Sequence, residues 1–332
     1  MKTLVTGATG FLGSAIAREL LKDGRKVRVL VRKDTDTENI DGLDLEIAYG
    51  DLRDKTSLHK ALQGCDVLYH TAAYYSLWDK DKRLSHDINV EGTRNILQAA
   101  KDLGLRKTVY TSTVGCIGLL PNKEPSNEET PFNPATLCND YKQSKYQAEQ
   151  VAREFHQKGL PVVIVNPSTP VGPRDIKPTP TGKIIVDFLN RKMPAYLDTG
   201  LNLIDVTDCA RGHILAEQKG IPGERYILGN RNMSLKEILL ALEKITGLKA
   251  PVVQMPYWVA FAAGWVCENL SDHLTGTPPA VPLAGVRMAK YFMYFDSSKA
   301  VRELGLPQNP IENALEEAVQ WYKDHSRISS AK

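Results

Sequence analysis

The sequence predicts an α/β fold, in which a doubly wound parallel sheet is followed by a smaller C-terminal α/β lobe that binds the substrate. Three observations lead to this prediction. From residue 3 to residue 112, β-prone runs alternate with helical apolar spacing, the order that produces a parallel sheet covered on both faces. A glycine-rich turn joins the first strand to the first helix. The length of 332 residues leaves room for a second lobe.

The chain changes character after Asn166, where prolines become frequent. We therefore assign residues 1–166 to a main domain and residues 167–325 mainly to a substrate-binding lobe. Residues 326–332 are expected to form a flexible tail.

The composition excludes several classes of protein. The formal net charge is +3, with acids and bases interspersed, so no nucleic-acid surface is indicated. The five cysteines contain no Cys-x-x-Cys pair and the seven histidines show no ligand spacing, so we predict neither disulfides nor a metal site. No signal peptide is recognisable, and no apolar stretch reaches the about 18 residues of a membrane span. The expected location is the cytoplasm.

The first strand, residues 3–6, leads into a turn with a glycine at every third position, and a helix follows over 14–22. Glycines in such a turn allow a tight bend, a close approach of a pyrophosphate, and close packing of the helix on the strand. The phosphates would lie at the helix N-terminus. A glycine turn without a ligand is the alternative. The expected contacts of a dinucleotide are Gly7, Thr9, Gly10, Phe11, Leu12 and Gly13.

The end of the second strand, residues 26–31, distinguishes the two nicotinamide cofactors. An acidic residue there binds the ribose 2′-hydroxyl of NAD(H), whereas an arginine accommodates the 2′-phosphate of NADP(H). This chain has Arg32 and Lys33 and no carboxylate at that point. NADP(H) is therefore favoured over NAD(H), and a solvent-exposed loop end is the alternative reading.

The alternation of strands and helices continues with two more candidate contact segments. Asp51, followed by Leu52, can accept a hydrogen bond from an adenine amino group. The small residues Thr71, Ala72 and Ala73 end a buried strand, where they allow a ring or sugar to lie against the backbone. The expected elements of this region are strand 45–49, helix 55–62, strand 66–70, helix 84–103 and strand 107–112.

Hydroxyl side chains end the last of these strands, at the edge of the sheet where ligands bind in open α/β folds: Thr111, Ser112 and Thr113. Tyr141 and Lys145 are four residues apart, so on a helix they share one face. A positive charge beside a phenol favours its ionised form, which makes the phenol a better acid/base near neutral pH. We predict that the pair transfers protons, and two ordinary solvated side chains are the alternative.

Taken together, these motifs resemble those of the extended short-chain dehydrogenases/reductases, whose fold is of the Rossmann type. The chain is similar to the dihydroflavonol-4-reductase-like group within that superfamily. Residues 165–182, 193–196 and 199–202 resemble the bacterial hopanoid-associated sugar epimerases. The matching motifs, in the family's order and spacing, are Thr6-Gly7-x-x-Gly10-x-x-Gly13, Asp51-Leu52, Thr111-Ser112-Thr113, Tyr141-x-x-x-Lys145 and Asn166-Pro167.

The resemblance implies that Tyr141 is the general acid/base, and that Lys145 both lowers its pKa and binds the nicotinamide ribose. Thr113 would orient the substrate oxygen, because Gly118 matches the glycine that ends the family's Ser/Thr motif. Ser112 would then face the cofactor. Further cofactor contacts are implied for Thr111, Pro167, Ser168 and Thr169.

The resemblance also bears on assembly and on the path of the chain. Residues 202–218 are similar to the family's strand and helix that return to the main domain. The family often dimerises through the helix that follows Thr71 and the helix that carries Tyr141, so a homodimer is expected.

Two departures from the family's motifs, together with Arg32, bear on the reaction. Ile117 stands where sugar-epimerising relatives usually carry Tyr, which weakens the inference of a nucleotide-sugar substrate. Val114 and Gly115 replace the Asp-Glu pair of the 4,6-dehydratases, so dehydration is not expected. Arg32 suits a reductase that consumes NADPH. We predict reduction of an aldehyde or ketone on a sugar-like or lipid-linked substrate, such as a hopanoid side-chain intermediate. The alternatives are an epimerase and a non-catalytic NADP-binding regulator or scaffold.

Four prolines between residues 170 and 180 predict a long irregular loop over the site. Arg174, Asp175 and Lys177 on this loop are candidates to contact a polar or anionic group of the substrate, and solvated loop charges are the alternative. Tyr74 is a further candidate for substrate contact.

Tyr257–Leu270 is a mostly apolar helix with Trp258, Phe261 and Trp265 near one face. It is a core helix of the small lobe, the lining of an apolar substrate channel, or a peripheral contact with a bilayer. It lacks the Lys/Arg-rich polar face of a good surface anchor. The other elements expected in this lobe are helix 209–218, strand 224–228, helix 234–246 with a Ser234/Glu237 capping box, and helix 311–323.

Overall fold

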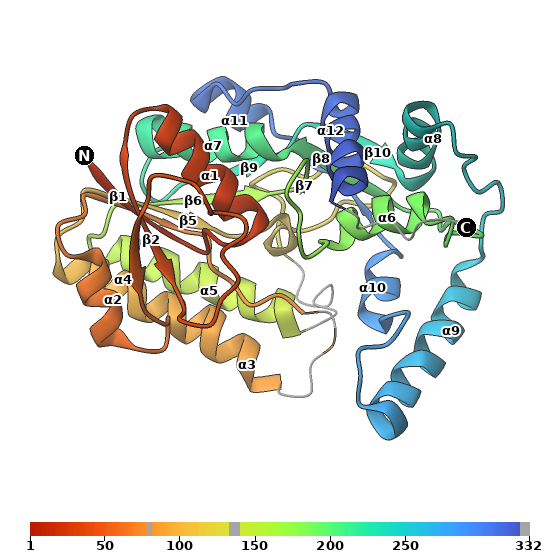
Figure 1. Cartoon of the computed structure of the whole chain (residues 1–332), viewed down its shortest axis with the longest axis horizontal. Helices are drawn as coiled ribbons and strands as arrows, with labels where there is room; N and C mark the ends of the chain where they lie inside the picture. The colour runs from red at the N-terminus through yellow and green to blue at the C-terminus, as the bar shows by residue number, and fades with distance from the viewer. Residues whose placement is uncertain (77, 79–81, 133–139, 326–332) are drawn as a thin grey trace.

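The computed structural model describes residues 1–76, 78, 82–132 and 140–325, which form two α/β lobes (Figure 1). The large lobe contains a seven-stranded parallel sheet with the strand order β3-β2-β1-β4-β5-β6-β9. The chain runs outward from β1 in both directions, so the order reverses between β1 and β4. Ligands of doubly wound sheets bind at such a reversal, outside the carboxyl ends of the strands. The predicted fold class is confirmed.

The strands of the large sheet form because short runs of β-branched and aromatic residues are bounded by turns. Val5 of β1 lies between Val29 of β2 and Tyr69 of β4, and all three are fully buried. The bounds of these strands are β1 (Lys2–Thr6), β2 (Lys26–Val31), β3 (Glu46–Tyr49), β4 (Val67–His70), β5 (Lys107–Thr111), β6 (Val162–Pro167) and β9 (Arg225–Leu228).

Helices cover both faces of this sheet, and the apolar stripe of each helix faces the strands (Figure 1). Against one face pack α1 (Phe11–Lys22), α7 (Val206–Lys219) and α11 (Ser298–Leu304). Against the other pack α2 (Lys55–Leu62), α4 (Gly92–Asp102) and α5 (Asp140–Gln157). The short helix α3 (Lys82–His86) continues through a π-helical turn (Asp87–Glu91) into α4, in place of the single helix predicted over 84–103.

The small lobe is built on a four-stranded sheet in which β8 pairs in parallel with β7 and β11 and antiparallel with β10. Three helices enclose its core, and the predicted capping box of Ser234 and Glu237 begins one of them. Its elements are β7 (Thr169–Val171), α6 (Pro180–Leu189), β8 (Gly200–Asp205), β10 (Arg231–Ser234), α8 (Leu235–Thr246), β11 (Phe292–Met293) and α12 (Ile311–Asp324).

The chain first leaves the large lobe after β6, near the expected boundary at residue 166, and then crosses between the lobes again. Helix α7 returns to the large sheet as expected, but residues 202–205 stay in the small sheet as part of β8. Strand β9 and helix α11 also belong to the large lobe, because their apolar residues complete its core. The predicted tail, residues 326–332, lies outside the described residues.

The proline-rich segment contains more regular structure than predicted. Pro170 lies in β7, which among the described residues pairs with β8 alone and is therefore an edge strand, where proline is tolerated. Pro180 occupies the first turn of α6, where the amide needs no helical acceptor. Between them, residues 172–179 form the irregular part of the loop.

Two helices project from the small lobe as a hairpin (Figure 1). They are α9 (Tyr257–Leu270), which continues into a π-helical turn (Ser271–Thr275), and α10 (Leu283–Met288). Only Ala260 and Gly264 of α9 are buried, so of the three readings left open for this helix the burial disfavours a core helix. None of the helices in the described part of the chain combines the length and the apolarity of a membrane span.

Candidate active site

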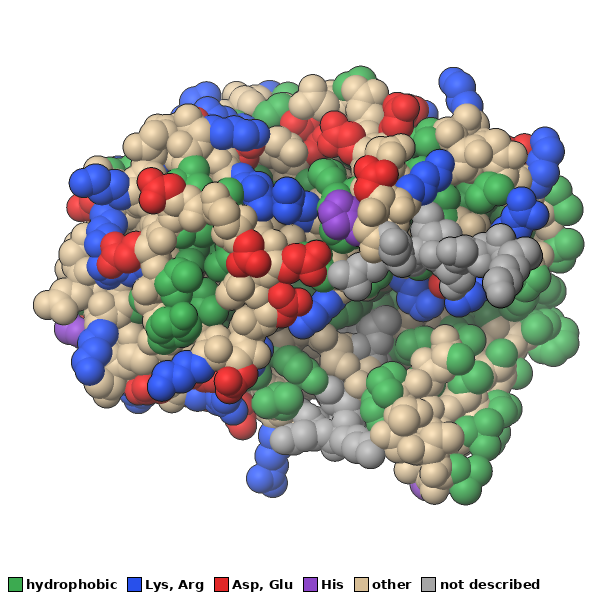
Figure 2. All heavy atoms as spheres, in the orientation of Figure 1, with side chains coloured by type: hydrophobic (Ala, Val, Ile, Leu, Met, Phe, Trp, Pro, Cys, Tyr) green, Lys and Arg blue, Asp and Glu red, His purple; other side chains and the backbone are tan. Residues whose placement is uncertain are grey.

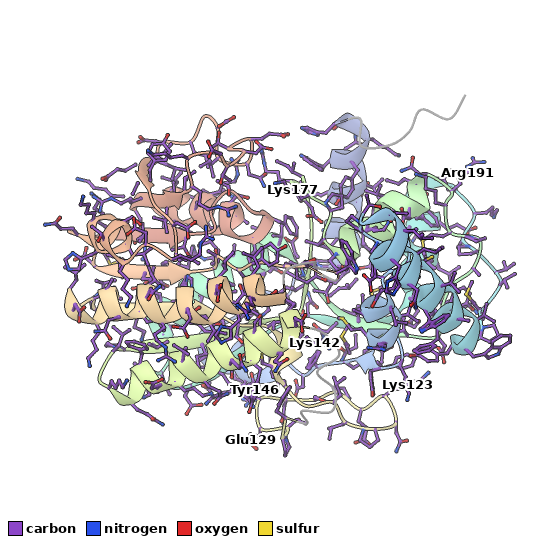
Figure 3. All side chains as sticks on the ribbon, turned by 90° about the horizontal axis from the view of Figure 1, so that it is seen from below. Lys123, Glu129, Lys142, Tyr146, Lys177 and Arg191 are labelled. Carbon is purple, nitrogen blue, oxygen red and sulfur yellow. The ribbon has the colours of Figure 1, made fainter. Side chains whose placement is uncertain are left out.

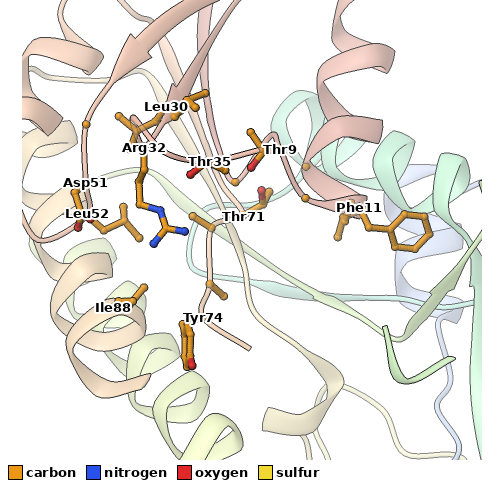
Figure 4. A pocket seen from close by; sticks show the side chains of 18 residues that line it. Thr9, Phe11, Leu30, Arg32, Thr35, Asp51, Leu52, Thr71, Tyr74 and Ile88 are labelled. Atoms are coloured by element: carbon orange, nitrogen blue, oxygen red, sulfur yellow. The ribbon is translucent and has the colours of Figure 1, made fainter. Parts of the chain in front are cut away.

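A continuous cleft lies at the carboxyl ends of the central strands, where the strand order reverses. It consists of two cavities of about 310 Å³ and about 720 Å³. Both are lined by Gly10, Phe11, Arg32 and Ala73, so they adjoin. Figure 4 shows the smaller cavity, which is bounded by the glycine turn, the ends of β2 and β4, and the segment after β3.

The glycine turn forms one wall of the smaller cavity for steric reasons. Gly7 has φ +74°, and a Cβ atom there would lie 2.7 Å from the backbone nitrogen of Ala72. A Cβ atom on Gly13 would lie 2.2 Å from the carbonyl oxygen of Gly7. Side chains at both positions are therefore excluded, and α1 packs tightly against β1 and the end of β4.

The N-terminus of α1 faces the smaller cavity. Gly10 is its N-cap and provides no side-chain cap, and Phe11, Leu12 and Gly13 of the first turn line the cavity. Backbone amides at a helix N-terminus bind anionic groups, so this wall fits the pyrophosphate of a dinucleotide. Thr9, also predicted to contact the cofactor, lines both cavities.

Arg32 provides a cationic group at the other end of the smaller cavity. Its side chain points into the cavity near Leu52 and Thr35 (Figure 4). Asp51 lies beside it and accepts two hydrogen bonds from the side chain of Arg53, at 2.9 and 2.8 Å. These bonds, with a smaller contribution from the charge of Arg32, lower the pKa of Asp51 to about 2. Lys33 is exposed and does not line either cavity. Of the two predicted cationic residues, Arg32 is therefore the one that faces the cleft.

Thr113 and Tyr141 both line the larger cavity. Thr113 caps a short turn after β5, where its Oγ1 accepts a hydrogen bond of 3.1 Å from the amide of Gly115. The hydroxyl hydrogen of Thr113 thereby remains able to donate toward the cavity. Tyr141 lies in the first turn of α5, and its ring meets the edge of Tyr75 with 4.5 Å between centroids.

The pKa of Tyr141 is raised, chiefly by burial of the phenol and further by neighbouring Tyr75. Lys145, one turn later on α5, donates hydrogen bonds to the Tyr110 hydroxyl at 3.1 Å and to the Thr111 carbonyl oxygen at 2.7 Å. Burial lowers the pKa of Lys145 to about 8. The expected lowering of the Tyr141 pKa by Lys145 is therefore not what the structure shows, because desolvation of the phenol dominates.

Two of the predicted cofactor contacts point away from the cleft. The Ser112 hydroxyl, predicted to face the cofactor, donates to Glu149 Oε2 at 2.6 Å instead. The Thr111 hydroxyl hydrogen-bonds Nε2 of His213 at 3.1 Å. Both side chains are buried behind the cavity wall.

Glu149 is a buried carboxylate beneath Thr113, with 2 % of its side chain exposed. It accepts hydrogen bonds from Ser112 and from Asn166 Nδ2, and it pairs with Arg153 at 3.0 Å and Arg225 at 3.5 Å. Asn166 also donates to the carbonyl oxygen of Thr113 at 2.9 Å. This network fixes the backbone that presents the Thr113 hydroxyl.

The predicted substrate contacts have mixed outcomes. Tyr74 and Lys177 line the larger cavity, as does Asp175, which accepts hydrogen bonds from Thr179 and Tyr322. Arg174 lies outside the cavity: it is exposed, has φ +75°, and lies close enough to Arg18 to help lower the pKa of that guanidinium. Five of the other predicted cofactor contacts line the cavity walls: Thr71, Ala72, Ala73, Ser168 and Thr169. Pro167 does not line either cavity.

The sequence did not single out Lys142, which lines the larger cavity immediately after Tyr141. Because Lys142 directly follows Tyr141, its position in the sequence could have marked it as a candidate. Figure 3 shows Lys142 on α5 and Lys177 before α6 at the boundary between the lobes. The rest of this wall is largely apolar and comes from both lobes: Tyr74, Tyr75, Val114, Pro170, Ile176, Pro178, Ile184, Leu201, Met288 and Met293.

Two buried histidines behind the site carry little charge at neutral pH. His70 lies between the hydroxyls of Thr6 and Thr93, and burial, followed by the charge of Lys145, lowers its pKa to about 3. Burial also lowers the pKa of His213 to about 4. Each ring is neutral in the folded chain but protonated in the unfolded chain below about pH 6.5.

This difference predicts sensitivity to acid. The stability that the neutral rings contribute is full above about pH 6.5 and is lost as the pH falls toward the folded-state values. We expect the free energy of unfolding to fall by about 2 kcal/mol for each histidine between pH 7 and pH 5, measured by urea unfolding. A His213→Gln variant should lose about half of the histidine contribution. An unchanged pH slope in that variant would contradict the assignment.

The part of the sequence that forms the glycine turn and most of the cleft also matches a known family. Residues 3–229 match the model of the "NAD dependent epimerase/dehydratase family". The chain belongs to this family. Among the described residues, no group of three His, Cys, Asp or Glu side chains is placed to hold a metal ion, and the family's nicotinamide cofactor fits the glycine turn described above.

Curated members of the family include reductases. The chain is 49% identical over 330 residues to the "Putative dihydroflavonol 4-reductase" of Synechocystis sp., covering 98% of this chain and 96% of that one. It is 37% identical over 332 residues to "Sterol demethylase protein B" of Methylococcus capsulatus, covering 99% and 100%. It is 30% identical to a farnesyl-dihydroquinoline-oxide ketoreductase of Stigmatella aurantiaca, covering 92% and 91%.

Solved structures show the same fold over nearly the whole chain. The crystal structure of gox2253 has a TM-score of 0.87 and 45% identity, covering 98% of this chain and 99% of that one. The UDP-glucuronic acid 4-epimerase of Bacillus cereus, in complex with UDP-glucuronic acid and NAD, has a TM-score of 0.78 and 26% identity, covering 98% and 100%. The epimerase/dehydratase fold thus accounts for both lobes.

Proposed function

We propose that the protein is an NADPH-dependent reductase of an aldehyde or ketone carried by a largely apolar, lipid-like substrate. The observation that carries the proposal is that Thr113 and Tyr141 line the same cavity. This cavity adjoins the dinucleotide cleft on one side and apolar side chains of the small lobe on the other.

The cofactor preference rests on Arg32. Its guanidinium lies in the cleft directly after β2, the position at which an acidic residue would bind the ribose hydroxyls. The carboxylate of Asp51, which also lines this cavity, is paired with Arg53. A guanidinium in that position binds a 2′-phosphate with charge-assisted hydrogen bonds. When bound, NADPH supplies a hydride to the carbonyl carbon.

The side chains of the site supply the other half of the reduction. The Thr113 hydroxyl donates a hydrogen bond to the carbonyl oxygen and holds it near Tyr141. Tyr141, whose raised pKa keeps the phenol protonated, gives its proton to the oxygen as the carbonyl is reduced to an alcohol. Lys145, one helical turn away, supplies the positive charge that favours the resulting phenolate.

The class of substrate is argued from the larger cavity. A nucleotide sugar carries a diphosphate. The cations that line this cavity are Lys142 and Lys177, besides the Arg32 that the proposal assigns to the cofactor. Apolar and aromatic side chains form most of the remaining wall. Relatives whose names contain a sterol and a farnesyl group support a lipophilic substrate. The hopanoid intermediate and the homodimer expected from the sequence stay predictions.

A second candidate function is epimerisation through a transient ketone, which the family description and the NAD-bound epimerase structure favour. Epimerisation begins by taking a proton from an alcohol, so it requires the phenolate of Tyr141. Burial raises the pKa of this phenol, so the epimerase, like the reductase, would depend on the positive charge of Lys145 one helical turn away. The third alternative, a non-catalytic NADP-binding regulator, predicts no turnover that depends on Tyr141.

The proposal is tested first through Arg32. We expect the wild-type protein to bind NADPH more tightly than NADH, and Arg32→Asp to weaken NADPH binding by about 10- to 100-fold, because charge-assisted hydrogen bonds are lost. NADH affinity should rise in this variant. The measurement is a fluorescence titration of both reduced cofactors.

Lys33→Asp is the matched control, because Lys33 has the same charge, is the next residue, and does not line the cleft. It should leave the NADPH/NADH ratio within about threefold of the wild type, since an exposed charge contributes little. If NAD co-purifies and survives gel filtration, the epimerase would be favoured. Equal affinity for both cofactors would remove the role of Arg32.

A further inference from the structure

The outward face of α9 carries a strip of exposed apolar side chains. The side chains of Trp258, Trp265, Val266 and Leu270 are 71%, 55%, 48% and 46% exposed. Ala262 and Ala263 are also exposed between them. Figure 2 shows hydrophobic side chains along the free edge of the hairpin. Single exposed apolar residues are ordinary, but a contiguous exposed patch marks a binding surface.

The strip follows from the spacing of residues along α9. Trp258 and Trp265 are seven residues apart, so they lie on the same side of the helix. Glu268, the one charged residue of α9, turns inward and accepts a hydrogen bond of 3.0 Å from the amide of Leu283 at the start of α10. The exposed face of α9 therefore carries no charged side chain.

The opposite side of the hairpin reaches the larger cavity. Gly264 of α9 lies against α10, where an added Cβ atom would be 3.3 Å from Val286 and 3.4 Å from Leu283. Met288 at the end of α10 then lines the cavity. A hairpin two helices thick thus separates the apolar strip from the apolar part of the cavity.

We propose that α9 docks the protein on the surface of a lipid bilayer, with Trp258 and Trp265 at the boundary between headgroups and acyl chains. Tryptophan is enriched at that depth because its ring is apolar and its indole N–H is polar. Six exposed residues on one projecting helix are also far fewer than the about 20 to 30 residues that each partner contributes to a stable protein interface. This difference favours a bilayer over a second copy of the chain.

Docking by α9 places the larger cavity beside the membrane. An apolar carbonyl compound dissolved in the bilayer then has a short path to Tyr141. This delivery role rests on the proposed function, whereas the membrane contact does not. Because the strip carries no charge, the contact depends on apolar burial and not on anionic lipids or low salt.

The test is flotation of the full chain with phosphatidylcholine vesicles, without substrate. The wild type should float with the vesicles equally at low and high salt. The double variant Trp258→Ser/Trp265→Ser should partition about 100-fold less, since burial of each large apolar side chain contributes about tenfold. Circular dichroism and NADPH titration show whether the variant is folded.

The control is Ile221→Ser/Leu240→Ser, which removes two side chains that are 57% and 48% exposed elsewhere on the molecule. It should float like the wild type. The proposal is overturned if the wild type stays with the soluble fraction, if it binds only anionic vesicles and is released by salt, or if the tryptophan variant floats normally. A dimer that the tryptophan variant abolishes, without any vesicle binding, would assign the strip to a second copy instead. Each of these outcomes leaves the reductase proposal standing.

Discussion

Replacing Tyr141 with Phe will lower kcat by about 10²- to 10⁴-fold, the range typical for loss of a positioned general acid. The ring and its edge contact with Tyr75 are kept, and only the hydroxyl that gives the proton is removed. NADPH affinity should stay within about threefold of the wild type, because the cofactor cleft is formed mainly by other residues. The measurement is steady-state oxidation of NADPH with a panel of apolar aldehydes and ketones, with Kd from fluorescence titration.

Tyr146→Phe is the matched control, since it removes a tyrosine hydroxyl from the same helix without touching the cavity. The Tyr146 ring stacks on Phe132 with 4.2 Å between centroids, and this contact is preserved. Its kcat should be close to that of the wild type. Unchanged turnover in Tyr141→Phe would exclude Tyr141 as the acid, and absence of turnover in every protein including the wild type would favour the regulator.

Glu149→Ala will destabilise the fold by about 3–5 kcal/mol, the cost of removing one partner from a buried charge cluster. Arg153 would lose its pairing carboxylate, and Ser112 and Asn166 would lose a shared acceptor. The measurement is urea unfolding at neutral pH. Because Asn166 also holds the Thr113 carbonyl oxygen, kcat should fall more than KM rises in the folded fraction.

Glu154→Ala provides the comparison on the same helix. Glu154 pairs with Arg94 and Lys158 at the surface, and 39% of its side chain is exposed. Exposed pairs contribute between 0 and about 1 kcal/mol, so the variant should be nearly as stable as the wild type. Equal stability of the Glu149 and Glu154 variants would show that the network beneath Thr113 is not structural.

The strands and helices of the large lobe were predictable because each obeys a local rule. Alternating β-prone and helical segments predict a parallel sheet. The glycine turn is recognisable because a side chain at Gly7 or Gly13 would clash with the neighbouring backbone. The membership of β9 and α11 in this lobe was not predictable. Their segments look like those of the small lobe, and only long-range packing assigns them to the larger core.

The placement of the glycine turn, Thr113 and Tyr141 at the cleft could be predicted, because each residue type has one main use in its context. The position of a side chain could not be predicted where the local direction of the backbone decides whether it faces the core or the cavity. Ser112 and Thr113 are adjacent hydroxyls, and the direction of the chain turns one into the core and the other into the cavity. Glu149 gives no sequence signal, because its partner Arg225 comes from a strand far along the chain.

The chain crosses between the lobes several times. It leaves the large lobe after β6, returns with α7 and β9, leaves again with β10, returns with α11, and ends in the small lobe with α12. No single cut of the polypeptide therefore releases an intact half. The small lobe is therefore not a separable C-terminal module, and we expect a truncation between the lobes to unfold both cores together.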